Sequence, residues 1–138
     1  MSHNYKDLIV WQKAKMLAGN IYRTTETFPR NEVYGLTSQL RRAAVSVASN
    51  IAEGQGRLTK GEFQQFLGHS RGSLLELETQ LSIATELRYI APDELAHLEA
   101  QTSEVMRLLN GLLASLRVKQ NRGELIDTPE TRNLKLET

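Results

Sequence analysis

The sequence predicts an all-α protein, folded as an antiparallel, up-down-up-down four-helix bundle. Apolar residues recur every three or four positions along four long segments, and no segment alternates in the manner of a β-strand. Glycine, proline or a helix-capping residue bounds each segment. Helices of roughly 20–30 residues, each about 30–45 Å long, form such a bundle when short turns join them. A helical solenoid is the alternative, but the chain has no repeat of the 20–50 residues typical of one.

The first helix is expected over residues 6–27 and the second over residues 36–53. Apolar side chains step by threes and fours along the first, which ends at the Phe-Pro pair at 28–29 because a residue before proline disfavours helical backbone. Gly54 and Gly56 follow the second helix. We expect this pair to provide a left-handed helix cap.

The third helix is expected over residues 59–88 and the fourth over residues 92–119. Thr59 begins a capping box, and a heptad seam of leucines and small residues runs along each of these two helices. The apolar pattern then ends. The bundle is therefore assigned to residues 1–119, and residues 120–138 are expected to form a flexible polar tail.

Two helices carry more apolar or small residues than the single stripe a bundle helix needs. The second helix has an additional apolar strip, and the third has small residues opposite its leucine seam. Glycine inside a helix costs about 1 kcal/mol relative to alanine, so we expect the close approach of another subunit to offset this cost. The oligomer-face candidates are Val45, Ala48, Ala52, Gly61, Gly68, Gly72 and Thr79.

The formal net charge of +1 hides a strong asymmetry along the 138 residues. Residues 1–60 carry nine basic and four acidic side chains, a balance of +5, whereas residues 61–116 carry three basic and eight acidic ones, a balance of −5. Such a division is typical of a nucleic-acid surface or of complementary surfaces in an assembly, and chance partition among surface residues is the remaining alternative.

Two groups of polar residues are candidates for function. Basic side chains of the first half would contact phosphates, and the candidates are Lys13, Lys15, Arg23, Arg30, Arg41, Arg57 and Lys60. A line of polar residues on the second helix faces charges on the third, and we interpret it as a network that fixes helix register. Its members are Arg42, Ser46, Asn50, Glu53, Arg71, Glu76 and Glu78.

The sequence offers no chemistry for an enzyme. The absence of cysteine excludes disulfides and cysteine-based metal or nucleophile sites, and no nucleophile-base, Walker or dinucleotide motif occurs. Glu94 and His97 form the only Glu-x-x-His motif, where a dimetal bundle needs two. The turn at 54–57 has the glycines of an anion-binding nest, but we interpret it as a helix cap. We therefore expect no catalytic residues, metal or cofactor.

The chain shows no membrane or export signal. No run of about 18 apolar residues occurs, and the first residues lack the apolar core of a signal peptide. We expect a cytoplasmic protein with no membrane partner.

Five segments of the chain resemble the sequence motifs of one small bacterial family. They are Asp7-Leu8-x-Val10-Trp11-Gln12-Lys13-Ala14, Phe28-Pro29-x-x-Glu32-x-Tyr34-Gly35-Leu36-Thr37-Ser38-Gln39, Arg41-Arg42-Ala43-Ala44-x-Ser46, Ser49-Asn50-Ile51-Ala52-Glu53-Gly54 and Gly72-Ser73-Leu74-x-Glu76-Leu77-Glu78-Thr79-Gln80. The family comprises four-helix-bundle proteins encoded in intervening sequences of 23S ribosomal RNA genes. The resemblance covers about residues 5–118.

The resemblance implies a homopentamer, a barrel-like ring with a central channel. Relatives include the accessory variability proteins of diversity-generating retroelements, which bind nucleic acid and a reverse transcriptase. The first hypothesis is therefore a non-enzymatic oligomer that binds RNA or DNA through phosphate contacts. The alternative is a protein–protein scaffold or accessory subunit, with a partner such as a reverse transcriptase and no direct nucleic-acid contact. A metal- or small-molecule-binding bundle is the third possibility.

Overall fold

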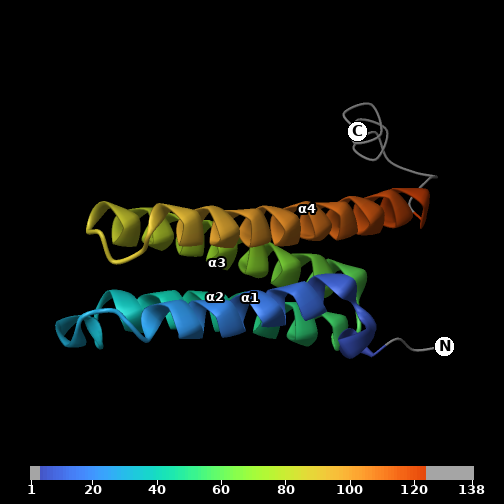
Figure 1. Ribbon diagram of the computed structural model, residues 1–138. Coiled ribbons are helices and arrows are strands. Elements are labelled where there is room, and N and C mark those ends of the chain that lie inside the picture. The colour runs from blue at the N-terminus through green and yellow to red at the C-terminus, as the bar shows by residue number, and fades with distance from the viewer. Residues whose placement is uncertain (1–3, 124–138) are drawn as a thin grey trace.

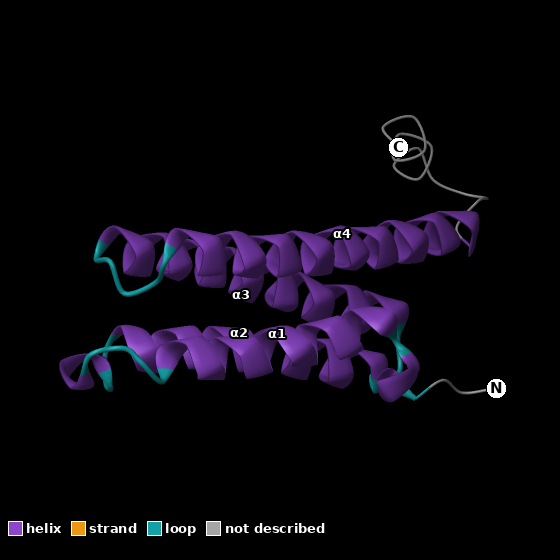
Figure 2. Cartoon of the chain, in the orientation of Figure 1, coloured by secondary structure: helices purple, strands orange, loops and turns teal. Residues whose placement is uncertain are grey.

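The computed structural model describes residues 4–123, with side chains described as far as residue 117. Four α-helices and two short 3₁₀ helices make up this part of the chain, and it contains no strand (Figures 1 and 2). In chain order they are η1 (Tyr5–Asp7), α1 (Ile9–Thr25), η2 (Arg30–Glu32), α2 (Leu36–Gln55), α3 (Lys60–Glu86) and α4 (Pro92–Gly123). The predicted all-α class and four-helix bundle are confirmed.

The four helices form two layers. Figure 1 shows α1 and α2 together in one layer and α3 and α4 in the other, with consecutive helices running in opposite directions. The helix α1 packs against α2 and α4, and α3 packs against α2 and α4, whereas the diagonal pairs do not meet within residues 4–123. The chain therefore passes around the bundle in sequence order. No helix in the described residues is long and apolar enough to cross a membrane.

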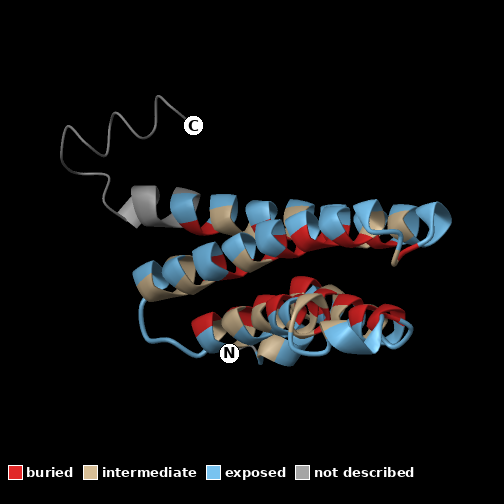
Figure 3. Cartoon of the chain, turned by 90° about the vertical axis from the view of Figure 1, so that its left-hand side faces the viewer, coloured by how far each residue is buried: buried red, intermediate tan, exposed pale blue. Residues whose placement is uncertain are grey.

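The core lies between the layers, and the buried residues of each helix are turned toward it (Figure 3). The leucine seam of α3 is buried as its heptad spacing predicts, and the seam of α4 packs against it. The largest fully buried side chains are Leu17, Ile21, Leu40, Val47, Ile51, Leu67, Leu74, Leu77, Leu81, Leu98, Val105 and Leu109. Their burial is the main source of stability, at about 25 cal/mol per Å² of apolar surface removed from water.

The helix ends differ from expectation by a few residues. The first α-helix begins at Ile9 instead of residue 6, because Asn4 accepts a hydrogen bond from the backbone N–H of Lys6 and starts the 3₁₀ turn η1. The N-terminal cap of α3 is confirmed, since the Thr59 hydroxyl oxygen accepts a hydrogen bond of 3.1 Å from the N–H of Glu62. The helix α4 continues beyond residue 119 to residue 123, and the rest of the expected tail lies outside the described residues.

The expectation of a left-handed glycine cap after α2 is wrong. Gly56 caps the helix with a right-handed φ of −83°, and Gly54 lies inside the helix. A Cβ atom on Gly54 would lie 2.8 Å from Cβ of Phe66 and 2.9 Å from Cδ1 of Phe63. Glycine is needed here because α3 approaches α2 closely. The same approach allows the buried Ser70 hydroxyl to donate a 2.7 Å hydrogen bond to the carbonyl oxygen of Val47.

A polar contact joins the α1–α2 loop to the α3–α4 loop. One carboxylate oxygen of Glu32 accepts from the backbone N–H of Leu36, and the other accepts from the Tyr89 hydroxyl at 2.9 Å. A Cβ atom on Gly35 would lie 2.7 Å from Oε1 of Glu32, so glycine leaves room for this cap. The hydrogen bond from Tyr89 to Glu32 raises the pKa of Tyr89 above its ordinary value.

Replacing Gly54 tests the close approach of α2 and α3. Gly54→Ala is expected to lower the free energy of unfolding by about 1–3 kcal/mol, because the added methyl group overpacks the contact with Phe66. Gly111→Ala is the matched control, since a Cβ atom there would meet nothing within 4 Å. The control is expected to raise stability by about 0.5–1 kcal/mol through helix propensity. Urea unfolding of both variants measures the difference, and equal effects would contradict the packing argument.

The Tyr89–Glu32 contact predicts a pH-dependent contribution to stability. Because the folded state raises the pKa of Tyr89, the contribution is complete below pH 10 and is lost as the pH rises through the folded-state pKa. We expect Tyr89→Phe to be less stable than the unaltered protein at pH 8. The difference in free energy of unfolding between the two proteins should shrink above pH 10. A difference that is constant from pH 8 to pH 11 would show that the phenol group does not carry the effect.

Candidate functional site

The fold turns the charge asymmetry of the sequence into an asymmetry between layers. Residues 1–60, with a balance of +5, form η1, α1, η2, α2 and the turn that leads to α3, whereas residues 61–116, with a balance of −5, form α3 and nearly all of α4 (Figure 1). The α1–α2 layer is therefore basic, and the acidic excess of the other layer lies along α3 and along α4 as far as residue 116. Three basic residues and no acidic one follow in the last turns of α4, at Arg117, Lys119 and Arg122. The positive charge of the α1–α2 layer attracts a polyanion to that layer.

A shallow groove runs between α1 and α2 on the basic layer. Its volume is about 340 Å³, and none of its eight lining residues is acidic. We call it the α1–α2 groove, and it is lined by Tyr5, Trp11, Lys15, Ala18, Val45, Ala48, Ser49 and Ala52. It brings three of the oligomer-face candidates together with one of the phosphate-contact candidates.

Cations lie over aromatic rings at and beside this groove. The ammonium nitrogen of Lys15 is 5.4 Å from the centroid of Trp11, and the Arg41 guanidinium carbon is 4.6 Å from that of Tyr22. Lys6 is 6.0 Å from the centroid of its neighbour Tyr5, whose ring meets Trp11 edge-on. Each pair is attractive through the quadrupole of the ring and holds a positive charge beside an exposed or half-buried π surface.

Hydrogen bonds hold Arg41 beside α1. Its Nε donates to the Thr25 hydroxyl oxygen at 2.8 Å, and its Nη2 donates to the carbonyl oxygen of Tyr22 at 3.3 Å. The Thr25 hydroxyl in turn donates to the carbonyl oxygen of Ile21 at 2.8 Å. The guanidinium is thus held at the junction of the two helices of the basic layer.

The other phosphate-contact candidates are dispersed. Lys13 faces α4 and forms an ion pair of 3.6 Å with Glu104, and Arg23 donates to the side-chain oxygen of Asn20. Arg57 stacks over Phe66 and lies 3.7 Å from a Glu53 oxygen. Arg30, in η2, and Lys60, the first residue of α3, are exposed at opposite ends of the bundle (Figure 1). The structure therefore brings only Lys15 and Arg41 to the groove side of α1 and α2.

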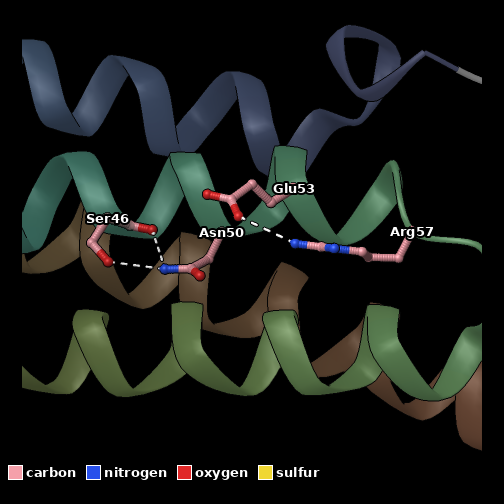
Figure 4. A network of polar contacts seen from close by, with 4 residues as sticks. All are labelled: Ser46, Asn50, Glu53 and Arg57. Carbon is pink, nitrogen blue, oxygen red and sulfur yellow. Dashed lines mark hydrogen bonds and ion pairs between the residues drawn. The ribbon is translucent and has the colours of Figure 1, made fainter.

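The polar line of α2 divides into two short groups (Figure 4). The Asn50 amide donates to the carbonyl oxygen and the hydroxyl oxygen of Ser46, at 2.8 and 2.9 Å. The Ser46 hydroxyl also lies 2.8 Å from that of Ser73 on α3, while Glu53 pairs with Arg57 one turn later.

The remaining members of the expected network lie apart from it. Arg71 donates to Asn110 of α4, and Glu78 is exposed on α3. Arg42 and Glu76 line one cleft with Ser46, yet neither forms an ion pair within the described residues.

A second set of oligomer-face candidates lies on the outer face of α3. Gly61, Gly68, Gly72 and Thr79 are all exposed, and a Cβ atom on any of the three glycines would meet nothing within 4 Å. Leu75 and Ile83, with 46% and 44% of their surface exposed, share this face at helical spacing. We define the outer α3 face as Gly68, Gly72, Leu75, Thr79 and Ile83.

Two features escaped the sequence analysis. The i,i+4 spacing of Trp11 and Lys15 signals their contact, but the pairing of Arg41 with Tyr22 depends on tertiary packing. Gln80 lines a cleft together with Arg42, and its side chain is buried. The heptad spacing of the leucines does not predict this burial. At the start of α4, Glu94 and His97 are exposed, and the described residues contain no group of three potential metal ligands.

Comparison with known proteins identifies a family model and a solved structure similar to this chain. The family model described as 23S rRNA-intervening sequence protein matches residues 6–111. A crystal structure from Bacteroides thetaiotaomicron VPI-5482, described as a protein with unknown function from the S23 ribosomal protein family, superposes with a TM-score of 0.69 at 19% sequence identity. The alignment covers 76% of this chain and 98% of that chain, and it shows a shared fold. No curated protein matches the sequence.

Proposed function

The chain belongs to the 23S rRNA-intervening sequence protein family, and we propose that it is a non-enzymatic homo-oligomer that binds nucleic acid through phosphate contacts on its α1–α2 layer. The observation that carries this proposal is the pairing of cations with aromatic rings on the basic layer: Lys15 lies over Trp11 in the α1–α2 groove, and Arg41 lies over Tyr22 outside the groove. Phosphate contacts supply sequence-independent affinity because they release counterions from the nucleic acid. RNA and DNA both satisfy this chemistry.

The aromatic rings of the groove side favour a single strand. Bases stack on exposed aromatic side chains, and cations beside the rings neutralise the adjacent phosphates. Trp11 and Tyr22 provide such rings, each with a cation already placed over one face. The acidic residues of α3 and of α4 up to residue 116 repel the same polyanion, which favours binding on the α1–α2 side of each subunit.

We propose that copies of the chain associate through the outer α3 face. Helix-interior glycines at 68 and 72 contact nothing within the subunit, and two large apolar residues are exposed beside them. Small residues allow a second helix to approach closely, and burying Leu75 and Ile83 supplies the apolar area. A homopentamer, with a central channel, is the proposed assembly.

The alternative function is a scaffold or accessory subunit without nucleic-acid contact. One observation favours it: apolar and small residues make up most of the α1–α2 groove and of the outer α3 face, and α3 carries more acidic than basic residues, unlike α1 and α2. Unlike faces that pack against each other form rings when the rotation closes. In that assembly the outer α3 face of one subunit covers the groove of the next, and a protein partner such as a reverse transcriptase binds elsewhere on the ring.

Salt-dependent binding tests the nucleic-acid proposal. We expect fluorescently labelled single-stranded RNA or DNA to bind the full chain at low salt, with an affinity that falls steeply as salt rises. Replacing Lys15 and Arg41 with glutamine is expected to weaken binding and to reduce the slope of log K against log salt by about two, one for each lost phosphate contact. Arg107→Gln, an exposed arginine on α4, removes one charge from the acidic layer and should leave the slope unchanged. Undetectable binding at low salt would contradict the proposal.

Two substitutions distinguish the assemblies. Leu75→Glu buries a charge in the outer α3 interface and is expected to dissociate the oligomer in sedimentation analysis under either function. Val45→Glu, in the groove, should leave the oligomer intact if nucleic acid occupies the groove, and should dissociate it if a neighbouring subunit does. Leu58→Glu is the control, because Leu58 is 98% exposed in the turn between α2 and α3. A monomeric unaltered protein at micromolar concentration would exclude both assemblies.

A further inference from the structure

A polar cleft lies between α2 and α3, on the side of α2 that faces away from α1. Its volume is about 360 Å³. We call it the α2–α3 cleft, and it is lined by Gln39, Arg42, Ala43, Ser46, Ser73, Glu76 and Gln80. The chain's proposed phosphate contacts lie elsewhere, so the cleft is a separate feature of the molecule.

The antiparallel packing of α2 and α3 determines which residues lie at each end of the cleft. The hydroxyls of Ser46 and Ser73 lie 2.8 Å apart and close one end. The two helices run in opposite directions, and Gln39 and Gln80 each lie two helical turns from the serine of their own helix. They therefore lie together at the other end of the cleft. The two serine hydroxyls form a hydrogen bond with each other, whereas the Gln80 amide oxygen at the other end has no hydrogen-bond partner.

Gln80 is the strongest sign of a missing partner. Only 8% of its surface is exposed, and its Oε1 atom is buried without a hydrogen-bond partner. A buried acceptor without a partner is destabilising, so native structures rarely keep one without a reason. Because Gln80 lines the cleft, turning its amide toward the cleft would bring this oxygen to an N–H group of a ligand.

Arg42 and Glu76 place opposite charges at the same cleft. Arg42 comes from the basic layer and Glu76 from the acidic one, and no ion pair joins them within 4.0 Å. The nearby Glu53 and Arg57, by contrast, do pair, at 3.7 Å. The cleft therefore offers the N–H donors of the Arg42 guanidinium and the two carboxylate oxygens of Glu76, none of them in an ion pair. It also contains the buried amide oxygen of Gln80 as an acceptor.

We propose that the α2–α3 cleft binds the base of an unpaired guanine nucleotide, a specificity that rests on the nucleic-acid function proposed above. The carboxylate of Glu76 accepts from N1–H and the N2 amino group, and the guanidinium of Arg42 donates to O6 and N7. The Gln80 amide, once turned into the cleft, accepts the remaining amino hydrogen through its oxygen, while Ala43 offers an apolar contact to the ring. Unpaired bases are commonly recognised through these same edges.

The donor and acceptor pattern distinguishes guanine from the other bases. Guanine alone presents two adjacent donors to one carboxylate and two acceptors to one guanidinium. Adenine and cytosine place a ring-nitrogen lone pair beside their amino group, which a carboxylate repels. Uracil has one N–H between two carbonyl oxygens, which likewise face a carboxylate unfavourably.

Nucleotide titration of the ¹⁵N-labelled full chain tests the proposal. GMP and dGMP are both expected to shift the side-chain amide resonance of Gln80, because the cleft contacts the base and not the sugar. AMP, CMP and UMP should bind about 5- to 150-fold more weakly, the discrimination of one bidentate contact. Inosine monophosphate, which lacks the N2 amino group, should also bind more weakly than GMP.

A matched pair of variants locates the binding site. Glu76→Gln is expected to lower GMP affinity about 5- to 150-fold, because it replaces one of the two acceptor oxygens with a donor. Glu78→Gln removes the same charge two residues away, at an exposed position outside the cleft, and should leave GMP affinity unchanged. Thermal unfolding of both variants verifies that they remain folded.

The outcomes separate this proposal from the proposed function. RNA binding with no preference for GMP over AMP, or a Gln80 shift with a free amino acid and not with GMP, would overturn the guanine site while leaving nucleic-acid binding in place. GMP binding without binding of RNA or DNA strands would retain the site and overturn the proposed function.

Discussion

The close approach of α2 and α3 is the constraint on which the remaining surfaces depend. Small side chains line this contact, and Gly54 is its tightest point because a Cβ atom there would collide with Phe66. The approach brings the Ser70 hydroxyl to the backbone of α2 and the Ser73 hydroxyl to Ser46. With larger residues the helices would separate, the two serine contacts would be lost, and the polar cleft beside them would lose its closed end.

This central pair also joins the two charged layers. The junction of α2 and α3 is one of two places where side chains of the two layers meet; at the other, between α1 and α4, Lys13 pairs with Glu104. Arg42 and Glu76 line the cleft at the α2–α3 junction without forming an ion pair. The two proposed binding sites therefore differ in chemistry: the α1–α2 layer offers positive charge, and the α2–α3 junction offers both donors and acceptors.

Most of the fold, but only part of the candidate site, was predictable from the sequence. Burial of residues at heptad spacing, such as Leu74 and Leu77, follows from periodicity alone, and the cap at Thr59 follows from local chemistry. Gly54 was misinterpreted because glycine serves helix caps and close helix contacts alike, and only the position of Phe66 decides between them. The pairing of Arg41 with Tyr22 and the burial of Gln80 depend on how neighbouring helices are rotated, which periodicity does not specify.

The glycines on the outer α3 face differ from Gly54 in having no neighbour within the subunit. Gly54 is explained within the chain, because α3 occupies the space that a side chain would need. Gly68 and Gly72 have no such neighbour, although each weakens α3 by about 1 kcal/mol relative to alanine. Leu75 and Ile83 lie beside them and expose nearly half of their surface, so an apolar patch accompanies two glycines that no contact within the subunit requires. A second helix packed against this face removes both costs at once, so the subunit's own energetics favour an assembly in which the outer α3 face is covered.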